Sequence, residues 1–426
     1  MVNRLKELLF AVFFGFAVAM IVYVASQTVL YWPFLNIQNR IDDSHFLRRF
    51  MIRGADKTET DNIVIVDIDD KTIKSLGNFK FKGWPRRYPA KVFSILKSDG
   101  AKLIFLDVIF EGRTRDSIEL ADSTKNAGNV IAGYYFNLDA KSKNHRPLDP
   151  IINEQFSTNM LGPQSLEKNQ FIKATDVNLP NYDFVRSVRA LGFTNYIPDP
   201  DGILRHIPLY IAYGSRLSPS VSLQIWMQLK GIHYSKADIS HRGIRFGNIF
   251  IPTDKHCFMR LNFKSSGSVY PYVSFLDVMQ GNFEPGIFRD KVVMIGSSAK
   301  RLGDLKRIPG YGSLPGVEVH ATALSTLLNE DYLTVLSGNM VIVISILCGI
   351  LTSVLFSFTH PFKVGLPVAV GTPLIMYVFS VYAFVEHSFL INISLPSFII
   401  LLLYFVVVFH RFMERYESEH VHRTIT

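Results

Sequence analysis

The stretch NIVIVDIDDKT, Asn62–Thr72, places four β-branched aliphatic residues directly before Asp67, Asp69 and Asp70. An uninterrupted apolar run of this kind is typical of a strand buried on both faces, as in a parallel sheet covered by helices. In such sheets, ligands bind beyond the carboxyl ends of the strands. The stretch therefore predicts an α/β fold and indicates where a functional site would lie.

Other segments extend this pattern on both sides of the stretch. AKLIFLDVIF (101–110) and KVVMIGSS (291–298) are further apolar strands, and KVFSILKS (91–98) and GVEVHATALSTLLN (316–329) have the apolar spacing of helices. The interval from about Leu138 to Leu191 shows no regular period. We expect one α/β domain with a mixed, largely parallel sheet.

Four apolar runs are long enough to cross a bilayer, which takes about 20 residues. They cover residues 8–32, 335–358, 364–385 and 389–409. The first run continues well past its signal-peptidase-like Ala17-Val18-Ala19, which favours an uncleaved anchor over a cleaved signal peptide. One span before the α/β domain and three after it are therefore expected.

Lysine and arginine near the spans predict the orientation, because cytoplasmic flanks are enriched in them. Arg4 and Lys6 precede the first span, Lys363 lies between the second and third, and Arg411 and Arg415 follow the fourth. We expect residues 1–7 and the tail 410–426 in the cytoplasm and residues 33–332 outside, in the periplasm or its equivalent. The protein is then a multi-pass protein of the cell membrane.

Almost all of the formal net charge of +9 falls in residues 33–332. A basic surface outside a membrane suits anionic lipid headgroups or an acidic ligand. Nucleic acid is not an expected partner, since no basic run is interleaved with aromatic residues. The two cysteines, Cys257 and Cys348, offer neither an internal disulfide nor a paired zinc site.

Five segments, in this order, resemble the CHASE type 2 domain, an extracytoplasmic sensory module of bacterial membrane receptors. They are IVIVDIDDKTIKSLG (63–77), GWPRRYPAKVFSILKSDGAKLIFLDVIFEG (83–112), GFTNYIPDPDGILRHIPLY (192–210), SPSVSLQIW (218–226) and FRDKVVMIGSSAKRLGDLKRIPGYGSLPGVEVHATALSTLL (288–328). One span before the domain and three after it also match that family. The resemblance implies a transmembrane sensor that acts as a homodimer.

The chain departs from the family pattern in two places. A second tryptophan usual in the family's WPW segment is absent, since Lys82-Gly83 precede Trp84 and Arg86 follows Pro85. Related receptors commonly continue into a nucleotide cyclase or a kinase, whereas 17 residues, 410–426, follow the last span here. We therefore expect a separate cytoplasmic effector; the alternative is the receptor half of a truncated adenylate or guanylate cyclase or sensor kinase.

The aspartates also resemble the first motif of haloacid-dehalogenase phosphatases, in which one carboxylate attacks phosphorus and the next exchanges protons. That motif needs a small or β-branched residue four positions after the nucleophile, where this chain has Lys71. In the later metal-binding segment an acid follows the glycine directly, but Ser297 and Ser298 follow Gly296 here. A periplasmic hydrolase is the less favoured alternative.

The candidate ligand-binding residues lie near the carboxyl ends of predicted strands. They are Asp67, Asp69, Arg86, Asp107, Ser297 and Asp304. The competing interpretation is structural, because acids at strand ends also cap amide groups and form ion pairs. No catalytic residue, metal site or cofactor is predicted, and the expected partners are an unidentified extracytoplasmic ligand and membrane lipid.

Several local patterns carry weaker predictions. Asp199 and Asp201 in NYIPDPDGILR (195–205) indicate a turn, with an oxygen-rich calcium loop as the alternative. Glu318 and His320 would face one side of an extended segment. GYGSLPG (310–316) is interpreted as a flexible loop, and Ser218 as the cap of the helix in SPSVSLQIWMQLKG.

Overall fold

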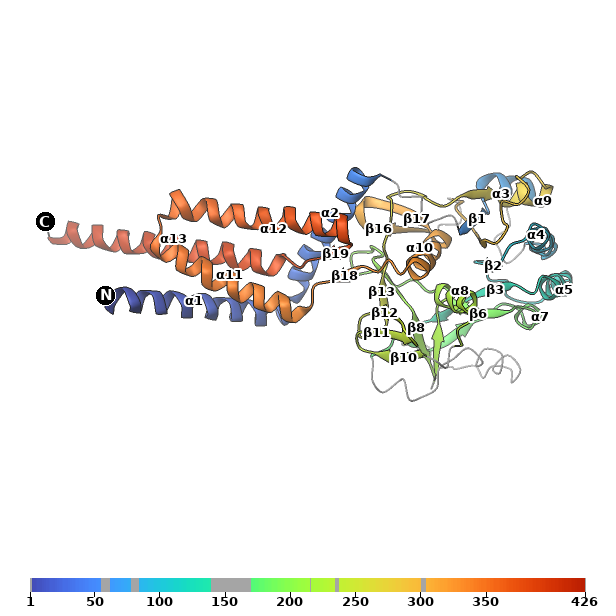
Figure 1. Cartoon of the computed structure of the whole chain (residues 1–426), viewed down its shortest axis with the longest axis horizontal. Coiled ribbons are helices and arrows are strands. Elements are labelled where there is room, and N and C mark those ends of the chain that lie inside the picture. The colour runs from blue at the N-terminus through green and yellow to red at the C-terminus, as the bar shows by residue number, and fades with distance from the viewer. Residues whose placement is uncertain are drawn as a thin grey trace. The chain divides into compact units, whose positions relative to one another are not determined.

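The computed structural model describes residues 2–54, 62–77, 84–138, 170–214, 216–233, 237–299 and 304–425. The chain forms two compact units, one made of Met1–Ile52 with Leu333–Thr426 and the other of Arg53–Tyr332. Figure 1 traces the chain through both units.

The first unit is helical. Its elements are α1 (Val2–Gln27), α2 (Tyr31–Arg53), β18 (Thr334–Val335), α11 (Gly338–Phe358), the π-helical turn η6 (Pro361–Gly365), α12 (Leu366–His387), β19 (Phe389–Leu390) and α13 (Ser394–Ile425). The last residue of α2, Arg53, is the first residue of the second unit. Among the described residues, four helices are long and apolar enough to cross a membrane: Arg4–Gln27, Gly338–Phe358, Pro361–His387 and Ser394–Glu417. The apolar run 8–32 is thus not one helix, since α1 ends at Gln27.

Helix α2 directly follows α1 and packs against α12 through polar side chains. The Ser44 hydroxyl lies 3.0 Å from the Tyr377 hydroxyl, and His45 Nε2 lies 3.0 Å from Ser380 Oγ. His45 is fully buried. Polar side chains of α2 therefore make its hydrogen bonds with α12.

A short parallel ladder joins the two connections at one end of the helical unit. β18 pairs with β19, and the Thr334 and Leu336 amides donate to Ser388 O at 3.1 Å and Leu390 O at 2.9 Å. The chain entering α11 is thereby hydrogen-bonded to the chain that connects α12 to α13.

The second unit is built on a seven-stranded sheet. In spatial order its strands are β14 (Tyr272–Ser274), β1 (Ile63–Asp67), β15 (Val292–Gly296), β2 (Leu103–Leu106) and β3 (Val130–Asn137), with β5 (Asp176–Asn178) and β6 (Ala190–Phe193) both pairing with β3. The pair β3–β5 is antiparallel and the other pairs are parallel.

Helices cover both faces of this sheet (Figure 1). Because side chains alternate along a strand, Val64, Val66, Ile104 and Leu106 point to one face and pack there with the apolar sides of the helices. The helices of this face are α3 (Asp70–Leu76), α4 (Arg87–Ser98), α5 (Ser117–Ala127), α7 (Tyr182–Val185) and α9 (Phe275–Gln280). The other face carries α8 (Val221–Lys230) and α10 (Gly316–Asn329), whose His320 ring meets Phe105.

Smaller sheets complete the unit. They are β4 (Lys173–Ala174) with β8 (Tyr210–Tyr213) and β9 (Arg216–Pro219); β7 (His206–Pro208) with β13 (Phe258–Arg260); β10 (Ala237–Ser240) with β11 (Gly243–Phe246) and β12 (Ile249–Pro252); and β16 (Leu305–Ile308) with β17 (Gly312–Pro315), linked by the 3₁₀ turn η5 (Pro309–Tyr311). GYGSLPG is therefore not a free loop, because its last residues form β17 and are paired with β16.

Two further sequence interpretations need correction. The cap of α8 is Ser220, whose side chain accepts from Leu223 N at 3.3 Å, while Ser218 belongs to β9. In the interval predicted to lack regular structure, residues 139–169 lie outside the described residues, and the remainder contains β4, β5, α7 and the start of β6. These are short elements, which leave little periodicity in a sequence.

Candidate functional site

The candidate site lies at the carboxyl edge of the main sheet, where β1, β15 and β2 are neighbours. Asp67 pairs with Gly296, and the Asp107 amide donates to Ile295 O at 2.8 Å, which places Asp107 on the other side of Gly296. Paired residues of neighbouring strands point to the same face of a sheet. Asp67 and Asp107 therefore flank Gly296 on the face covered by α10.

Gly296 is the point at which α10 approaches the sheet. A Cβ added there would lie 2.8 and 2.9 Å from the two γ carbons of Val317 and closer still to its Cβ. Ordinary carbon contacts are about 3.5–4.0 Å, so any larger residue would displace the helix. The first turn of α10 therefore lies over Gly296 on the same face as the two flanking carboxylates.

Asp67 is held by the segment after β15. Its carboxylate accepts from Ser298 N at 2.8 Å and from the Ser298 hydroxyl. Burial raises the pKa of Asp67, and the two Ser298 bonds partly offset that rise. The Ser297 hydroxyl donates to Ile68 O at 2.8 Å and accepts from Ala299 N. The structure thus brings the predicted Asp67 and Ser297 together across neighbouring strands.

Asp107 belongs to a second group with Asp304, Lys306 and Tyr196. Lys306 Nζ lies 2.9 Å from Asp304 Oδ1 and 4.8 Å from the centre of the Tyr196 ring. The pKa of Asp107 is raised to about 8, mainly by burial and also by Asp304, while Lys306 lowers it. At neutral pH, Asp107 is therefore mostly protonated, unlike an ordinary surface aspartate.

This group is attached to the start of α10. The Tyr196 hydroxyl donates to Gly316 O at 2.5 Å, and the Gly316 amide donates to Asp304 O at 2.9 Å. A Cβ at Gly316 would lie 2.8 Å from the Tyr196 oxygen and 2.9 Å from Asp304 Cγ. Burial raises the pKa of Tyr196 well above its usual value, so the hydroxyl keeps its proton and remains a donor.

Asp69 and Arg86 have other partners. Asp69 caps α3 by accepting from Thr72 N at 2.7 Å, which is the structural role weighed for it. The Arg86 guanidinium donates to Trp84 O and Glu111 O, at 3.0 and 3.2 Å, and stacks 4.1 Å from the centre of the Phe110 ring. Burial lowers the pKa of Arg86, partly offset by Asp116.

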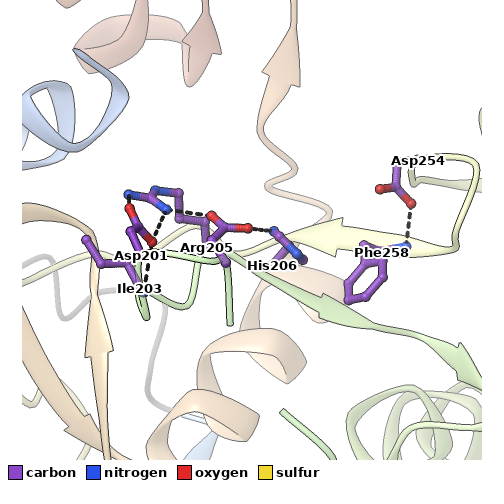
Figure 2. A network of polar contacts seen from close by, with 7 residues as sticks. Asp201, Ile203, Arg205, His206, Asp254 and Phe258 are labelled. Carbon is purple, nitrogen blue, oxygen red and sulfur yellow. Dashed lines mark hydrogen bonds and ion pairs between the residues drawn. The ribbon is translucent and has the colours of Figure 1, made fainter. Parts of the chain in front are cut away.

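The loop that carries Tyr196 is held by an ion-paired turn (Figure 2). Arg205 bonds Asp199 at 2.5 Å and Asp201 at 2.8 Å, and its own side chain is 4 % exposed. His206 Nδ1 lies 3.5 Å from the other Asp199 oxygen. The segment does form a turn, in which the Gly202 amide donates to Asp199 O at 2.8 Å and both carboxylates bond the Arg205 guanidinium.

The same turn is tied to the hairpin that supplies Asp304 and Lys306. The Leu204 amide donates to Arg307 O at 2.8 Å, within β16. The Asn195 side chain, at the start of the loop, bonds both Phe136 N and Phe136 O at 2.8 Å on β3. The loop that carries Tyr196 is therefore held at its start by β3 of the sheet and at its end by the β16–β17 hairpin.

Glu318 and His320 do not share a side, which corrects the expectation for an extended segment. They lie two residues apart in α10, on different sides of a helix. Glu318 accepts from Ser268 Oγ and Tyr272 OH at 2.7 Å, whereas the His320 ring lies 4.7 Å from that of Tyr196. Among the described residues, no group of three or more His, Cys, Asp or Glu side chains could hold a metal ion.

Sequence reasoning missed Ser298, Tyr196 and Lys306. Ser298 adjoins the chosen Ser297, and Tyr196 lies in one of the segments that carried the family resemblance. Lys306 gives no local signal, since it reaches the site only through the β16–β17 hairpin.

Comparison with known families agrees with this architecture. The family model described as CHASE2 domain matches residues 16–355. Searches of curated proteins and of solved structures gave no match. The match covers well over half of the 426 residues and includes the strands, the α10 helix and the carboxylates described above. The chain belongs to the CHASE2 domain family.

Proposed function

We propose that this protein is a transmembrane sensor, which detects a stimulus outside the cell membrane and passes it to a cytoplasmic output. The CHASE2 match and the four helices able to span a membrane support this proposal. So does the distribution of lysine and arginine, which favours cytoplasmic termini and an extracytoplasmic 33–332 region between one span and three.

The observation that carries the proposal is the attachment of α10 to the carboxylate site. Its first residue, Gly316, is bonded by Tyr196 and by the Asp304 backbone, and Val317 packs on Gly296. At its other end α10 finishes at Asn329, and eight residues separate it from the start of α11 at Gly338. A change at the carboxylates would thus act on a helix that the chain connects directly to a candidate span.

The charge at this site favours a stimulus that carries positive charge or hydrogen-bond donors. Asp67, Asp107 and Asp304 lie near the first turn of α10, which itself carries Glu318, and Lys306 is the basic residue paired with Asp304. A cationic ligand would compete with Lys306 for Asp304 and would favour the ionised form of Asp107. It would shift the receptor only if it bound the two packings of α10 with different affinities.

The output is proposed to be a separate cytoplasmic effector contacted by α13, with membrane lipid and a second copy of the chain as further partners. The alternative is a receptor half fused in the natural product to a cyclase or kinase. An antibody against residues 53–332 would separate these in source membranes. A band at 48.4 kDa favours the separate effector, and a much larger one favours the fusion.

Hydrogen exchange on the full chain in nanodiscs tests the coupling. Gly316→Ala and Tyr196→Phe release the start of α10 in different ways, one by steric displacement and the other by loss of one hydrogen bond. We expect both to speed amide exchange in α10 and to change exchange in the last turns of α13. Gly267→Ala is the matched control, because a Cβ there meets nothing within 4 Å.

The outcome that contradicts the proposal is specific. Faster exchange in α10 with unchanged exchange in α13, in both variants, would mean that the site holds the fold together without communicating along the chain. The carboxylates would then have only a structural role.

A further inference from the structure

A groove of about 910 Å³ lies between α4 and α5, on the face of the sheet opposite α10. Its walls include Lys91 and Ile95 of α4, Ile118, Glu119 and Asp122 of α5, and Met279 of α9. Ile118 is 55 % exposed, although it is a large aliphatic residue. The groove thus combines exposed apolar surface with charge, as protein interfaces do.

The two helices run in the same direction at matching heights. α4 leads into β2 and α5 into β3, which are parallel neighbours. The hydroxyls of Ser94 and Ser123 lie 3.0 Å apart across the groove, so these residues are level. One turn earlier on each helix, Lys91 is level with Glu119.

The charges are separated by sign across the groove. α4 contributes Arg87 and Lys91, and α5 contributes Glu119 and Asp122, all four exposed. In the described part of the chain, Lys91, Glu119 and Asp122 form no ion pair, and Arg87 lies 5.5 Å from the centre of the Tyr88 ring. The basic wall and the acidic wall of one molecule do not neutralise each other.

We propose that this groove binds the same groove of a second copy of the chain. A two-fold axis running along the groove places α4 of one copy opposite α5 of the other and keeps their heights equal. Each Lys91 then faces Glu119 of the partner. Both Ile118 side chains become buried at the interface. A two-fold interface uses the same surface on both copies, so a surface with one basic and one acidic wall is complementary to itself.

A charge-swap experiment on the full chain tests the pairing. Two differently tagged copies are expressed together, one is captured from solubilised membranes, and the recovery of the other is measured. Lys91→Glu in both copies, or Glu119→Lys in both, brings like charges together, and we expect recovery to fall about tenfold, since like charges that face each other oppose association. Lys91→Glu with Glu119→Lys restores opposite charges at both contacts and should restore recovery.

The controls separate this inference from the proposed function, whose homodimer it specifies. Lys97→Glu makes the same charge reversal on an exposed part of α4 outside the groove, and should leave recovery unchanged. Equal recovery for wild type and both single reversals would overturn the groove as the interface, while leaving a dimer and the sensor proposal intact. No recovery even for wild type would refute the dimer itself.

Discussion

Replacing Gly296 by alanine places one methyl group between the sheet and α10. The added carbon would lie 2.8 and 2.9 Å from the γ carbons of Val317 and nearer to its Cβ. Neither side yields easily, because Gly296 lies in a strand paired on both sides and Val317 is fully buried. The helix must therefore retreat from the carboxylate site.

The size of the effect follows from these distances. Comfortable carbon contacts are about 3.5–4.0 Å, so the first turn of α10 has to move by about 1 Å. Overpacking of a close-packed interior by one methyl group costs about 1–3 kcal/mol. In a unit of this size, 2 kcal/mol lowers the midpoint of thermal unfolding by roughly 4–8 °C.

Tryptophan fluorescence of the full chain in detergent measures this midpoint. Trp84 and Trp226 are buried in the second unit and report its unfolding, whereas Trp32 is 54 % exposed. Gly267→Ala serves as the control and should unfold with the wild type. Val317→Gly removes the Cβ that the new methyl group would meet, so its cost should be smaller in the Gly296→Ala background. Additive costs, or an unchanged midpoint for Gly296→Ala, would refute the close approach.

Two further predictions concern single groups. The raised pKa of Asp107, from 3.8 to about 8, means that the folded chain holds a proton that the unfolded chain releases, so this group lowers stability as pH rises between those values. Asp107→Asn should therefore reduce the decline in the free energy of unfolding between pH 5 and pH 9 by about 2 kcal/mol, after allowance for partial solvation; parallel curves of stability against pH for the two proteins would contradict it. Ser220→Ala should cost about 1 kcal/mol and speed amide exchange in the first turn of α8, whereas Ser218→Ala should leave that turn unchanged; equal effects would contradict the assigned cap.

The sheet was predictable where strands are buried on both faces. β1, β15 and β2 are continuous apolar runs, which is a strong local signal for a strand in a parallel sheet. GYGSLPG was misread because β17 is a strand only by pairing with β16, and neither has an apolar pattern. Strands of two to four residues carry too few alternations to be recognised.

The position of part of the candidate site, at one edge of the sheet, was also predictable from the sequence. The rule that strand ends meet at one edge of a parallel sheet places Asp67, Ser297 and Asp107 together. It could not separate them from Asp69, whose side chain turns back to cap α3. It could not find Tyr196 at all, because that residue depends on the pairing of a distant turn with β16.

The two-residue ladder between β18 and β19 has a mechanical consequence. A strand that is pulled at one end passes the pull to whatever is hydrogen-bonded beside it as well as to the chain ahead. Tension arriving along the chain at Leu333 would thus be divided between α11, through the covalent backbone, and α13, through the amides of Thr334 and Leu336. The helices α11 and α13 would then be displaced together. Without these two hydrogen bonds, the tension would reach α11 alone, through the backbone.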